Sequence, residues 1–329
     1  MEFTALQITE TTEGTFERNF VKRTAPELGQ NEVRIAVKYA ALNYKDALSA
    51  TGNKGITKKY PHTPGVDASG VVAATTSALF AVGDQVLVTG YDLGMNTNGG
   101  FGEYIQVPAA WVVPLPSAFS LKQAMVLGTA AFTAALALYK MEQNGQTPEQ
   151  GAILVTGATG GVGSLAVAIL AHAGYQVIAA TGKPQSHAYL KTLGATDFKT
   201  REDLNTVSTR ALVSSQWAGA IDNVGGNTLA NCLKACKAKG NVAACGLVQS
   251  PELTTTVFPF IIKGINLLGI DSAETPMPLR LKIWQKLSED WNVTDKLSSI
   301  TTTIPLTQIN EYIDKMLQGE NIGRTIVEM

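Results

Sequence analysis

The chain has 329 residues, of which 45% are hydrophobic and 16% charged, and its formal net charge is −1. This is the composition of an ordinary globular protein that is long enough for two domains with sizeable cores. A charge so close to zero gives no electrostatic reason to expect nucleic acid or an anionic membrane as a partner. We therefore expect neither.

The N-terminal stretch MEFTALQITETTEG has no basic start and no apolar core, so we do not expect a secretion signal. The longest uncharged stretch, residues 123–139, contains Gly128, Thr129 and Thr133. It is shorter than a membrane span of about 20 residues. We expect a cytoplasmic protein.

Three cysteines and three histidines are the first candidates for a metal site. Cys232 and Cys236 are four residues apart, on one face of a helix expected near 229–238, and Cys245 is the third cysteine. An odd count without a CxxC pair argues against a disulfide framework and against structural zinc. The histidines at 62, 172 and 187 are scattered and fit no HExxH pattern. We expect no metal.

Up to about residue 115 the chain is rich in short β-like segments. VRIAVKY, VDASGVVA, DQVLVTG and FGEYIQVP are separated by Gly and Pro, as in a compact barrel. Four polar residues, NYKD (43–46), follow the first of these segments. They predict either a helix capped by Asn43 or Asp46, or a catalytic edge. The stretch alone leaves both interpretations open.

Pro114 and Pro116 indicate a boundary, and from about residue 120 strands alternate with helices. Strands are expected at AILVTG, YQVIAATG, near Asp197, at AGAIDNVGG and at NVAACG, with helices over 162–173, 187–193 and 229–238. This alternation predicts a parallel sheet covered on both faces. NLLGID, an amphipathic helix over 279–287 and a strand-like GRTIVEM follow. Whether this ending completes the first domain stays open.

The most specific signal is ILVTGATGGVGSLAVAIL (153–170), in which an apolar strand runs into a glycine cluster and a helix leaves it. This is the context of a dinucleotide-binding turn. Glycines let the backbone approach a pyrophosphate, and the helix N-terminus supplies N–H groups and positive dipole. With Ala158 in the first position of G-x-G-x-x-G, Gly160 and Gly163 fall on its second and third glycines, and Gly157 lies just before the pattern.

The next strand decides the cofactor. About 20 residues after the glycines, an NAD enzyme places Asp or Glu on the ribose 2′-hydroxyl. Here the strand VIAA ends in Thr181, Gly182 and Lys183, with Ser186 and His187 close behind. A hydroxyl and an ammonium would bind a 2′-phosphate that a carboxylate would repel. A solvated loop lysine explains Lys183 but not the absent acid, so NADP(H) is favoured.

Seven segments resemble, in the same order, those of the medium-chain dehydrogenases/reductases: NYKD, PGVDASGVV, GGFGEY, GTAAFTA, VTGATGGVGS, DNVGG and GRTIV. Within that superfamily the chain resembles the zinc-free quinone oxidoreductase branch, and most closely the acrylyl-CoA reductase (AcuI/YhdH-like) group. There LNYKDAL, VTGA-(S/T)-GGVGS and LGIDS recur together. Zinc-dependent relatives have a metal-binding cysteine in the segment corresponding to ALNYKD, where this chain has Asn43 and Tyr44.

The resemblance implies an α/β fold with a Rossmann doubly wound parallel sheet domain and a GroES-like β-barrel domain. We place the barrel (catalytic) domain at 1–122, the NADP-binding domain at 123–262 and a return to the catalytic domain at 263–329. The resemblance also implies a cofactor cleft between the domains, and homodimers.

The resemblance further implies the site residues. Tyr44 lies beside the nicotinamide in relatives, and Asn43 and Asp46 shape the same pocket, so these three are the expected catalytic set. The other expected cofactor contacts are Thr129, Leu247 and Ile270 near the nicotinamide, Thr159, Gly160, Gly161 and Val162 on the pyrophosphate, Thr181, Gly182, Lys183 and Arg201 around the 2′-phosphate, and Asn321 in the C-terminal closing segment. Leu247 and Ile270 could instead be core residues, and Arg201 a solvated charge.

Three functions remain to be weighed. The first is an NADPH-dependent reductase of an activated C=C bond, by resemblance an acrylyl-CoA-type enoyl thioester, which a conjugated carbonyl polarises without a metal. The second is an NADPH:quinone oxidoreductase. Lys54, Lys58 and Lys59 could meet the phosphates of a CoA substrate, although a solvated basic loop explains them too. The third is a non-catalytic NADPH-binding protein, which would not need the NYKD cluster.

Overall fold

A computed structural model describes residues 1–207 and 209–329 and divides them into two compact units. The first unit contains residues 1–129, 273–288 and 300–329, and the second contains 130–272 and 289–299. The sequence predicts domain boundaries after residues 122 and 262, and the compact units of the structure divide after residues 129 and 272.

Extended strands of the first unit form a seven-stranded, mostly antiparallel sheet and a separate hairpin. The sheet order is β14-β15-β3-β4-β5-β7, and β6 also pairs with β3. The strands are β1 (Glu2–Glu10), β2 (Phe16–Thr24), β3 (Glu32–Leu42), β4 (Asp67–Thr75), β5 (Gln85–Thr89), β6 (Tyr104–Pro108), β7 (Val113–Pro114), β14 (Thr301–Pro305) and β15 (Arg324–Glu328). Alternating apolar residues of β3, such as Val33, Ile35 and Val37, are buried in its core.

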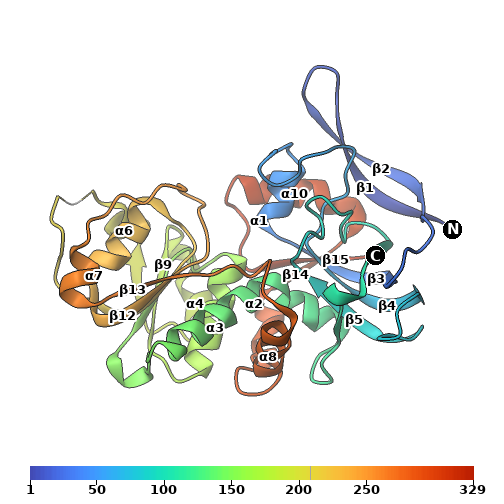
Figure 1. Cartoon of the computed structure of the whole chain (residues 1–329). Helices are drawn as coiled ribbons and strands as arrows, with labels where there is room; N and C mark the ends of the chain where they lie inside the picture. The colour runs from blue at the N-terminus through green and yellow to red at the C-terminus, as the bar shows by residue number, and fades with distance from the viewer. Residues whose placement is uncertain (208) are drawn as a thin grey trace. The chain divides into compact units, whose positions relative to one another are not determined.

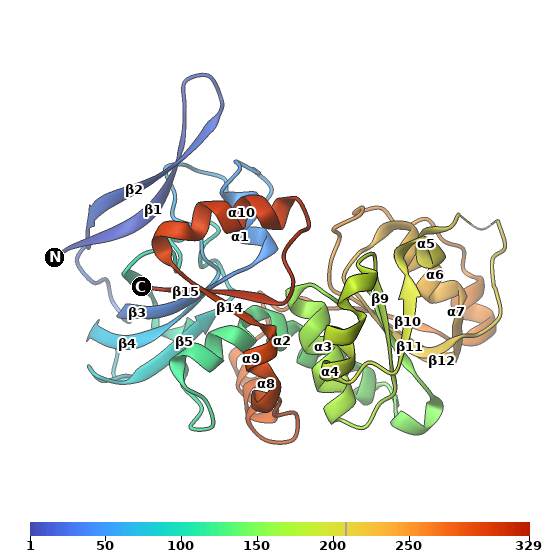
Figure 2. The ribbon, with the colours of Figure 1, turned by 180° about the vertical axis from the view of Figure 1, so that it is seen from behind.

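The C-terminal strands complete this sheet. β15 pairs antiparallel with β3, with Thr325 opposite Leu42, and β14 pairs parallel with β15. Figures 1 and 2 show the two ends of the chain brought together in this way. Periodicity left open whether the C-terminal segment completes the first domain. The pairing of β15 with β3 shows that it does, so residues 130–272 of the second unit are inserted into the first.

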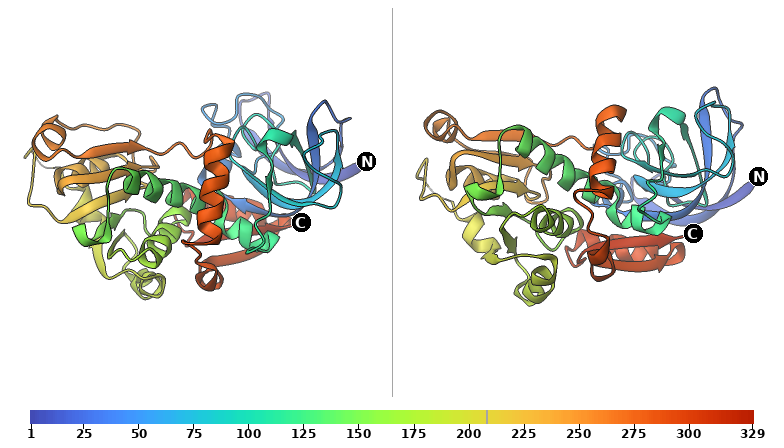
Figure 3. Two further views of the ribbon diagram at one scale, coloured as in Figure 1. Left: turned by 60° about the horizontal axis from the view of Figure 1, so that its bottom comes forward. Right: turned by 90° about the horizontal axis from the view of Figure 1, so that it is seen from below.

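Helices of the first unit are short and packed on the sheet. They are α1 (Tyr44–Ser49), α8 (Met277–Ser288) and α10 (Ile309–Leu317), with 3-10 turns η1 (Ala109–Trp111) and η5 (Leu306–Gln308). Figure 1 shows α1 beside α10, and their apolar residues share one core cluster. Helix α8, drawn clearly in Figure 3, is anchored by Trp284 against Phe119 and by buried Arg280, whose Nη1 donates to the Thr89 carbonyl at 2.7 Å.

The second unit is a six-stranded parallel sheet in the order β10-β9-β8-β11-β12-β13. Numbered along the chain this is 3-2-1-4-5-6, the doubly wound order of a Rossmann domain. The strands are β8 (Ile153–Val155), β9 (Val177–Thr181), β10 (Asp197–Thr200), β11 (Trp217–Asp222), β12 (Cys236–Ala244) and β13 (Asn266–Gly269). The predicted α/β class with a parallel sheet is confirmed.

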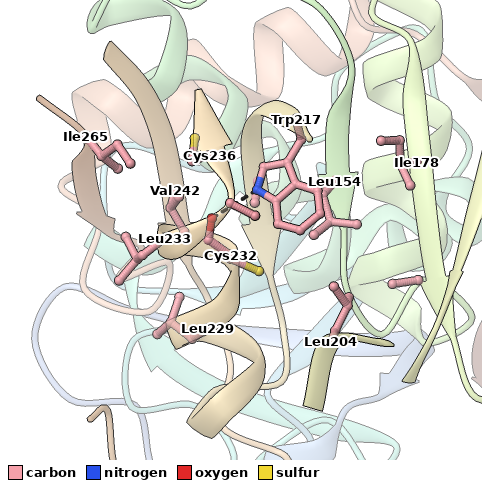
Figure 4. Packing of buried hydrophobic residues seen from close by; sticks show 13 residues of the cluster. Leu154, Ile178, Leu204, Trp217, Leu229, Cys232, Leu233, Cys236, Val242 and Ile265 are labelled. Carbon is pink, nitrogen blue, oxygen red and sulfur yellow. Dashed lines mark hydrogen bonds between the residues drawn. The ribbon is translucent and has the colours of Figure 1, made fainter. Parts of the chain in front are cut away.

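The helices and turns that accompany this sheet are α3 (Gly161–His172), α4 (His187–Leu193), α5 (Arg201–Asn205), α6 (Gly226–Lys234), α7 (Phe258–Lys263), η2 (Pro148–Gln150), η3 (Pro184–Ser186) and η4 (Thr294–Lys296); α9 (Leu297–Ile300) follows η4. The core between β11 and α6 is built on Trp217, whose indole N–H donates to the Cys232 carbonyl at 3.0 Å (Figure 4). The helix expected over 229–238 was wrong at its end, because Cys236 begins strand β12 instead of sharing a helix with Cys232.

Helix α2 (Leu121–Gln143) is kinked at Gly128, where φ is 46°. By length and composition it could cross a membrane, but 83% of its apolar window is buried inside the structure. Such burial is that of a core helix. The kink lies one residue before the end of the first unit's N-terminal segment, residues 1–129.

Candidate functional site

The polar run after β3 begins a helix. Asn43 is the N-cap of α1, with extended backbone at φ −121° and ψ 161°, and Asp46 Oδ2 accepts from the Asn43 backbone N–H at 2.8 Å. A carboxylate at the third helical position that reaches back to the cap is half of a capping box. The simple expectation of a capped helix is correct, and it does not exclude a catalytic role for the residues it exposes.

Asp46 is completely buried and is held by backbone donors. Its Oδ1 accepts from the N–H groups of Gly65 at 3.1 Å and Val66 at 2.9 Å. Burial raises the pKa of Asp46 to about 7, and the charge of Asp67 adds to the rise, while the three backbone hydrogen bonds oppose it. Asp46 therefore fastens α1 to the backbone of Gly65 and Val66, just before β4.

A buried ion pair lies beside this helix start. Arg324, the first residue of β15, places Nη2 3.3 Å from Asp67 Oδ2, and both side chains are almost inaccessible. The same guanidinium donates to the carbonyls of Val126 and Met125 at 3.0 and 3.2 Å. Burial lowers the pKa of Arg324, while Asp67 acts to raise it. These contacts tie the last strand to the last turn before the α2 kink.

The side-chain amide of Asn43 is hydrogen-bonded to both members of the ion pair. Its Nδ2 donates to Asp67 Oδ2 at 2.9 Å and to the Ala41 carbonyl at 3.2 Å, and its Oδ1 accepts from Arg324 Nη1 at 2.9 Å. Both amide protons are thus committed within the protein. Asn43 and Asp46 are arranged to position the start of α1.

Tyr44 differs from these neighbours because it is exposed. It is the first residue of α1, and 36% of it is accessible. A phenol in such a place can donate a hydrogen bond outward from a rigidly held backbone. Of the three residues expected to be catalytic, Tyr44 is the one whose side chain is exposed.

The glycine turn of the second unit connects β8 to α3. Gly160 is the N-cap, and Gly161 and Val162 are the first two helical residues, whose N–H groups have no acceptor within the helix. A Cβ on Gly163 would lie 2.2 Å from the Gly157 carbonyl oxygen, so only glycine fits there. Thr159, nearly buried, precedes them. This arrangement fits the pyrophosphate of a dinucleotide.

The end of β9 carries the expected 2′-phosphate residues. Thr181 ends the strand, and its Oγ1 accepts from the Lys183 N–H at 3.0 Å. Because β10 pairs in register with Thr200 opposite Thr181, Arg201 comes out beside Gly182. A Cβ built on Gly182 would lie 2.9–3.0 Å from the Arg201 guanidinium. A cation therefore stands where an NAD enzyme would need a carboxylate.

The remaining expected residues are more widely distributed. Leu247 lies in the loop after β12 and is 57% exposed, so the alternative of a core residue is wrong for it. Ile270, which follows β13, is half-buried, and its N–H donates to the Ala244 carbonyl at 3.1 Å. Asn321 lies between α10 and β15 and donates to the Tyr312 carbonyl at 3.3 Å.

Two functional candidates, Asp67 and Arg324, were missed although both lie in segments that carry the family resemblance. They are the aspartate of PGVDASGVV and the arginine of GRTIV. An acid and a base separated by 257 residues give no local signal, because neither periodicity nor spacing pairs them. The only available hint was the position of each charge at the start of an apolar strand.

Metal ligation is not supported by the residues present. Within 1–207 and 209–329, no group of three or more His, Cys, Asp or Glu side chains could hold a metal ion. Cys232 and Cys236 are buried in the core of the second unit, and burial raises the pKa of both thiols. These donors do not fit a zinc ion, which binds deprotonated thiolates.

Two family models match the chain. An alcohol dehydrogenase GroES-like domain matches residues 29–117, and a zinc-binding dehydrogenase domain matches 161–286. The ligand geometry described above does not support the zinc in the second name. The matched ranges lie largely in the first and second unit respectively.

Curated relatives resemble the chain over most of its length. The putative quinone oxidoreductase YhfP of Bacillus subtilis is 44% identical over 303 residues, and acrylyl-CoA reductase AcuI of Ruegeria pomeroyi is 43% identical over 303 residues, each match covering 92% of both chains. The crystal structure of the yhdH oxidoreductase from Salmonella enterica in complex with NADP has a TM-score of 0.95 at 39% identity, and that of yhfP with NAD bound has 0.96 at 42%; both cover 100% of each chain.

The raised pKa of Asp46 predicts a specific pH dependence of stability. An unfolded aspartate ionises near pH 4, so between about pH 4 and 7 the folded chain binds more protons at this group. The stability that Asp46 contributes is therefore lost as pH rises through about 7. Urea unfolding is measured at pH 5, 6, 7 and 8 for the wild type and for Asp46→Asn. As the pH rises toward 7, the unfolding free energy of the wild type should fall relative to that of Asp46→Asn by up to about 1.4 kcal/mol per pH unit.

The control is Asp84→Asn, which changes an exposed aspartate in a turn of the same unit. Its difference in unfolding free energy from the wild type should stay constant over the same pH range. An equally constant difference for Asp46→Asn would show that Asp46 ionises alike in the folded and unfolded chains.

Proposed function

Because this chain is an oxidoreductase of the medium-chain dehydrogenase/reductase superfamily, in the group of the quinone oxidoreductases and acrylyl-CoA reductases, we propose that it uses NADPH to reduce an activated C=C bond. The substrate we propose is an acrylyl-CoA-type enoyl thioester. The observation that carries the proposal is the start of α1, where buried groups hold an exposed phenol. A conjugated carbonyl needs such a donor and no metal.

The reaction needs three contributions. Bound NADPH supplies a hydride to the β-carbon of the double bond. Negative charge then develops on the thioester oxygen, and the Tyr44 hydroxyl donates a hydrogen bond to that oxygen. The α-carbon takes a proton from solvent, which completes the saturated thioester. Asn43 and Asp46 position Tyr44 and do not touch the substrate.

Most of the cofactor-binding residues that we propose lie in the second unit, and Thr129 and Asn321 belong to the first. Gly160, Gly161, Val162 and Thr159 hold the pyrophosphate, and Thr181, Gly182, Lys183 and Arg201 hold the 2′-phosphate. Thr129, Leu247 and Ile270 contact the nicotinamide half, and Asn321 closes the site. The cytoplasm is the proposed compartment, and three free cysteines are consistent with it.

A quinone remains the second candidate substrate, because one relative at 44% identity carries that name. Of the three lysines that could bind the phosphates of a CoA thioester, not all support such a substrate. Lys54 Nζ lies 2.5 Å from Glu10 Oε2 and 4.7 Å from the Tyr60 ring centre, so a structural role accounts for it. Lys58 and Lys59 remain exposed and are the better candidates.

The proposed function is tested by following NADPH oxidation with acrylyl-CoA, propionyl-CoA, simple enones, quinones and aldehydes. Acrylyl-CoA should be turned over and propionyl-CoA should not. Turnover of quinones with no enoyl-CoA turnover would assign the second candidate. Tight NADPH binding without turnover of any acceptor would make this chain a nucleotide-binding protein instead.

Tyr44→Phe should lower kcat with acrylyl-CoA at least about tenfold, since losing one preorganised donor costs about 10²–10³. The Kd for NADPH should stay within about a few-fold of the wild type. Tyr39→Phe, which removes a hydroxyl bonded to Glu328 in the same unit, is the control and should leave both values unchanged. A wild-type kcat with a weakened NADPH Kd would make Tyr44 a cofactor contact only.

NADPH should be preferred over NADH by about 10- to 100-fold in kcat/KM, the effect of one charge-assisted contact of about 1.5–3 kcal/mol. Arg201→Gln and Lys183→Asp should each narrow the ratio of kcat/KM values, and Lys199→Gln, two residues before Arg201, should not. Since yhfP has been crystallised with NAD, the ratio must be measured on this chain. Equal kcat/KM for both cofactors in the wild type would contradict the assignment.

We also propose a homodimer formed through the second unit. Strand β13 lies at one end of the sheet, so its outer edge can pair with another strand. Beside it, α7 exposes Phe258, Ile261 and Ile262, with Ile261 71% accessible. An apolar strip next to an open edge suits a two-fold interface with a second copy.

Light scattering after size-exclusion chromatography should give twice the chain mass for the wild type. Ile261→Glu should yield the monomer, because a carboxylate would be buried in the interface. Leu79→Glu, which changes an equally exposed residue of the first unit, should remain a dimer. A monomeric wild type would refute the proposed assembly.

A further inference from the structure

Asp222, the last residue of β11, is a completely buried carboxylate in the DNVGG segment. Its Oδ1 accepts from the Thr156 hydroxyl at 2.7 Å, and its Oδ2 accepts from the Gly225 N–H at 2.8 Å. Burial raises the pKa of Asp222, while these two hydrogen bonds and one from the Val224 N–H oppose the rise. A buried carboxylate without such donors would be costly, so Asp222 and the groups around it hold one another in place.

Thr156 connects this carboxylate to the glycine turn, residues 157–163. It follows β8 directly, and the pairing of β8 with β11 ends one residue before it, at Val155. Its hydroxyl accepts from the Asn223 N–H at 3.0 Å, and its carbonyl accepts from Asn223 Nδ2 at 2.8 Å. The side chains of Thr156, Asp222 and Asn223 therefore continue the junction of the two strands up to the point where the turn begins.

The turn has a second anchor and little freedom between the two. The N–H of Ala158 donates to the Ala180 carbonyl of β9 at 3.0 Å. Gly157 has φ 58°, which favours glycine, and a Cβ there would lie 3.5 Å from both Asn223 Cβ and Val224 Cγ2. A displacement at the end of β8 would therefore carry the turn with it, together with the free N–H groups at the start of α3.

Only a carboxylate can make both side-chain bonds of Asp222. Its two oxygens accept from two donors, whereas an amide would place an NH₂ group against one of them. One donor, Thr156, precedes the glycine turn, and the other, Gly225, is the N-cap of α6. Both loops follow strands of the parallel sheet at the edge where doubly wound proteins bind ligands, and all these residues belong to the second unit.

We propose that Asp222 and Thr156 are positioning residues of the pyrophosphate site. Asp222 holds the Thr156 hydroxyl, and Thr156 fixes the place where the glycine turn leaves β8. Neither side chain touches the cofactor, because both are buried and bonded within the protein. The proposal rests on the proposed NADP(H) function, and it gives the DNVGG segment a role in cofactor binding.

The test compares NADP⁺ with adenosine 2′-monophosphate, which keeps the adenosine and the 2′-phosphate but has no pyrophosphate. Their Kd values are measured on the full chain by competition with NADPH, whose fluorescence reports binding. Thr156→Val keeps the shape and removes the hydroxyl. It should raise the Kd of NADP⁺ at least about 10-fold, the effect of losing one N–H contact to a charged phosphate. The Kd of adenosine 2′-monophosphate should change less than about twofold.

Two control variants separate positioning from a general loss of stability. Thr156→Ser retains the hydroxyl and should bind both ligands like the wild type. Thr196→Val removes a hydroxyl that donates to the Val177 carbonyl at 3.1 Å, at the opposite end of β9 from the site. It should leave both Kd values unchanged, and a selective loss of NADP⁺ in Thr196→Val would overturn the proposal.

A double-mutant cycle tests whether Asp222 acts through Thr156. Asp222→Asn should weaken NADP⁺ selectively, and adding Thr156→Val to it should cost much less than Thr156→Val costs alone. Losses that simply add would show that Asp222 does not act through Thr156. Should Asp222→Asn fail to fold by circular dichroism, the Thr156 variants still decide whether this junction positions the turn.

Equal losses of both ligands in Thr156→Val, or no loss of either, would overturn the positioning role and leave the NADP(H) function intact. A wild-type chain that does not bind NADPH would refute the proposed function itself. Binding of NADP⁺ without any binding of adenosine 2′-monophosphate would refute the proposed 2′-phosphate residues. The wild-type measurements therefore distinguish these failures from a failure of the positioning role.

Discussion

The buried ion pair between Asp67 and Arg324 is the constraint on which the first unit depends. It joins the start of β4 to the start of β15, and through Asn43 and Thr129 it fixes the beginning of α1 and the kink of α2. Removing one partner of a buried pair leaves an uncompensated charge and costs about 3–5 kcal/mol. The pair is thus a strong determinant of which segments meet, whatever its net contribution to stability.

This constraint separates the hydrogen-bonded polar residues at the start of α1 from an exposed one. Asn43 and Asp46 direct their polar atoms inward, to Asp67, Arg324 and backbone groups. Tyr44, between them in sequence, is directed outward because the first turn of a helix rotates neighbouring side chains about 100° apart. Within the NYKD cluster, Asn43 and Asp46 therefore hold the start of α1 in place, and Tyr44 is exposed on it.

In the second unit, the order and register of the strands position the glycine turn, Thr181 and Arg201. The parallel strand order brings the carboxyl ends of β8 and β9 to one edge, where the glycine turn and Thr181 lie. The register of β10 on β9 then delivers Arg201 to Gly182. The position of Arg201 in this unit therefore depends on strand pairing as much as on local sequence.

The sequence by itself determined the α/β class, the glycine turn and the absence of an acid after β9, because each is a local pattern of periodicity or composition. Helix ends were not determined in this way, because α6 ends at Lys234 and β12 begins at Cys236, inside the range expected to be helical. Only the tertiary structure decided that the C-terminal strands complete the first sheet, that Asp67 pairs with Arg324, and that Arg201 stands beside Gly182. These depend on contacts between residues far apart in the chain or on adjacent strands. No local pattern in the chain encodes which distant charge a buried charge will find.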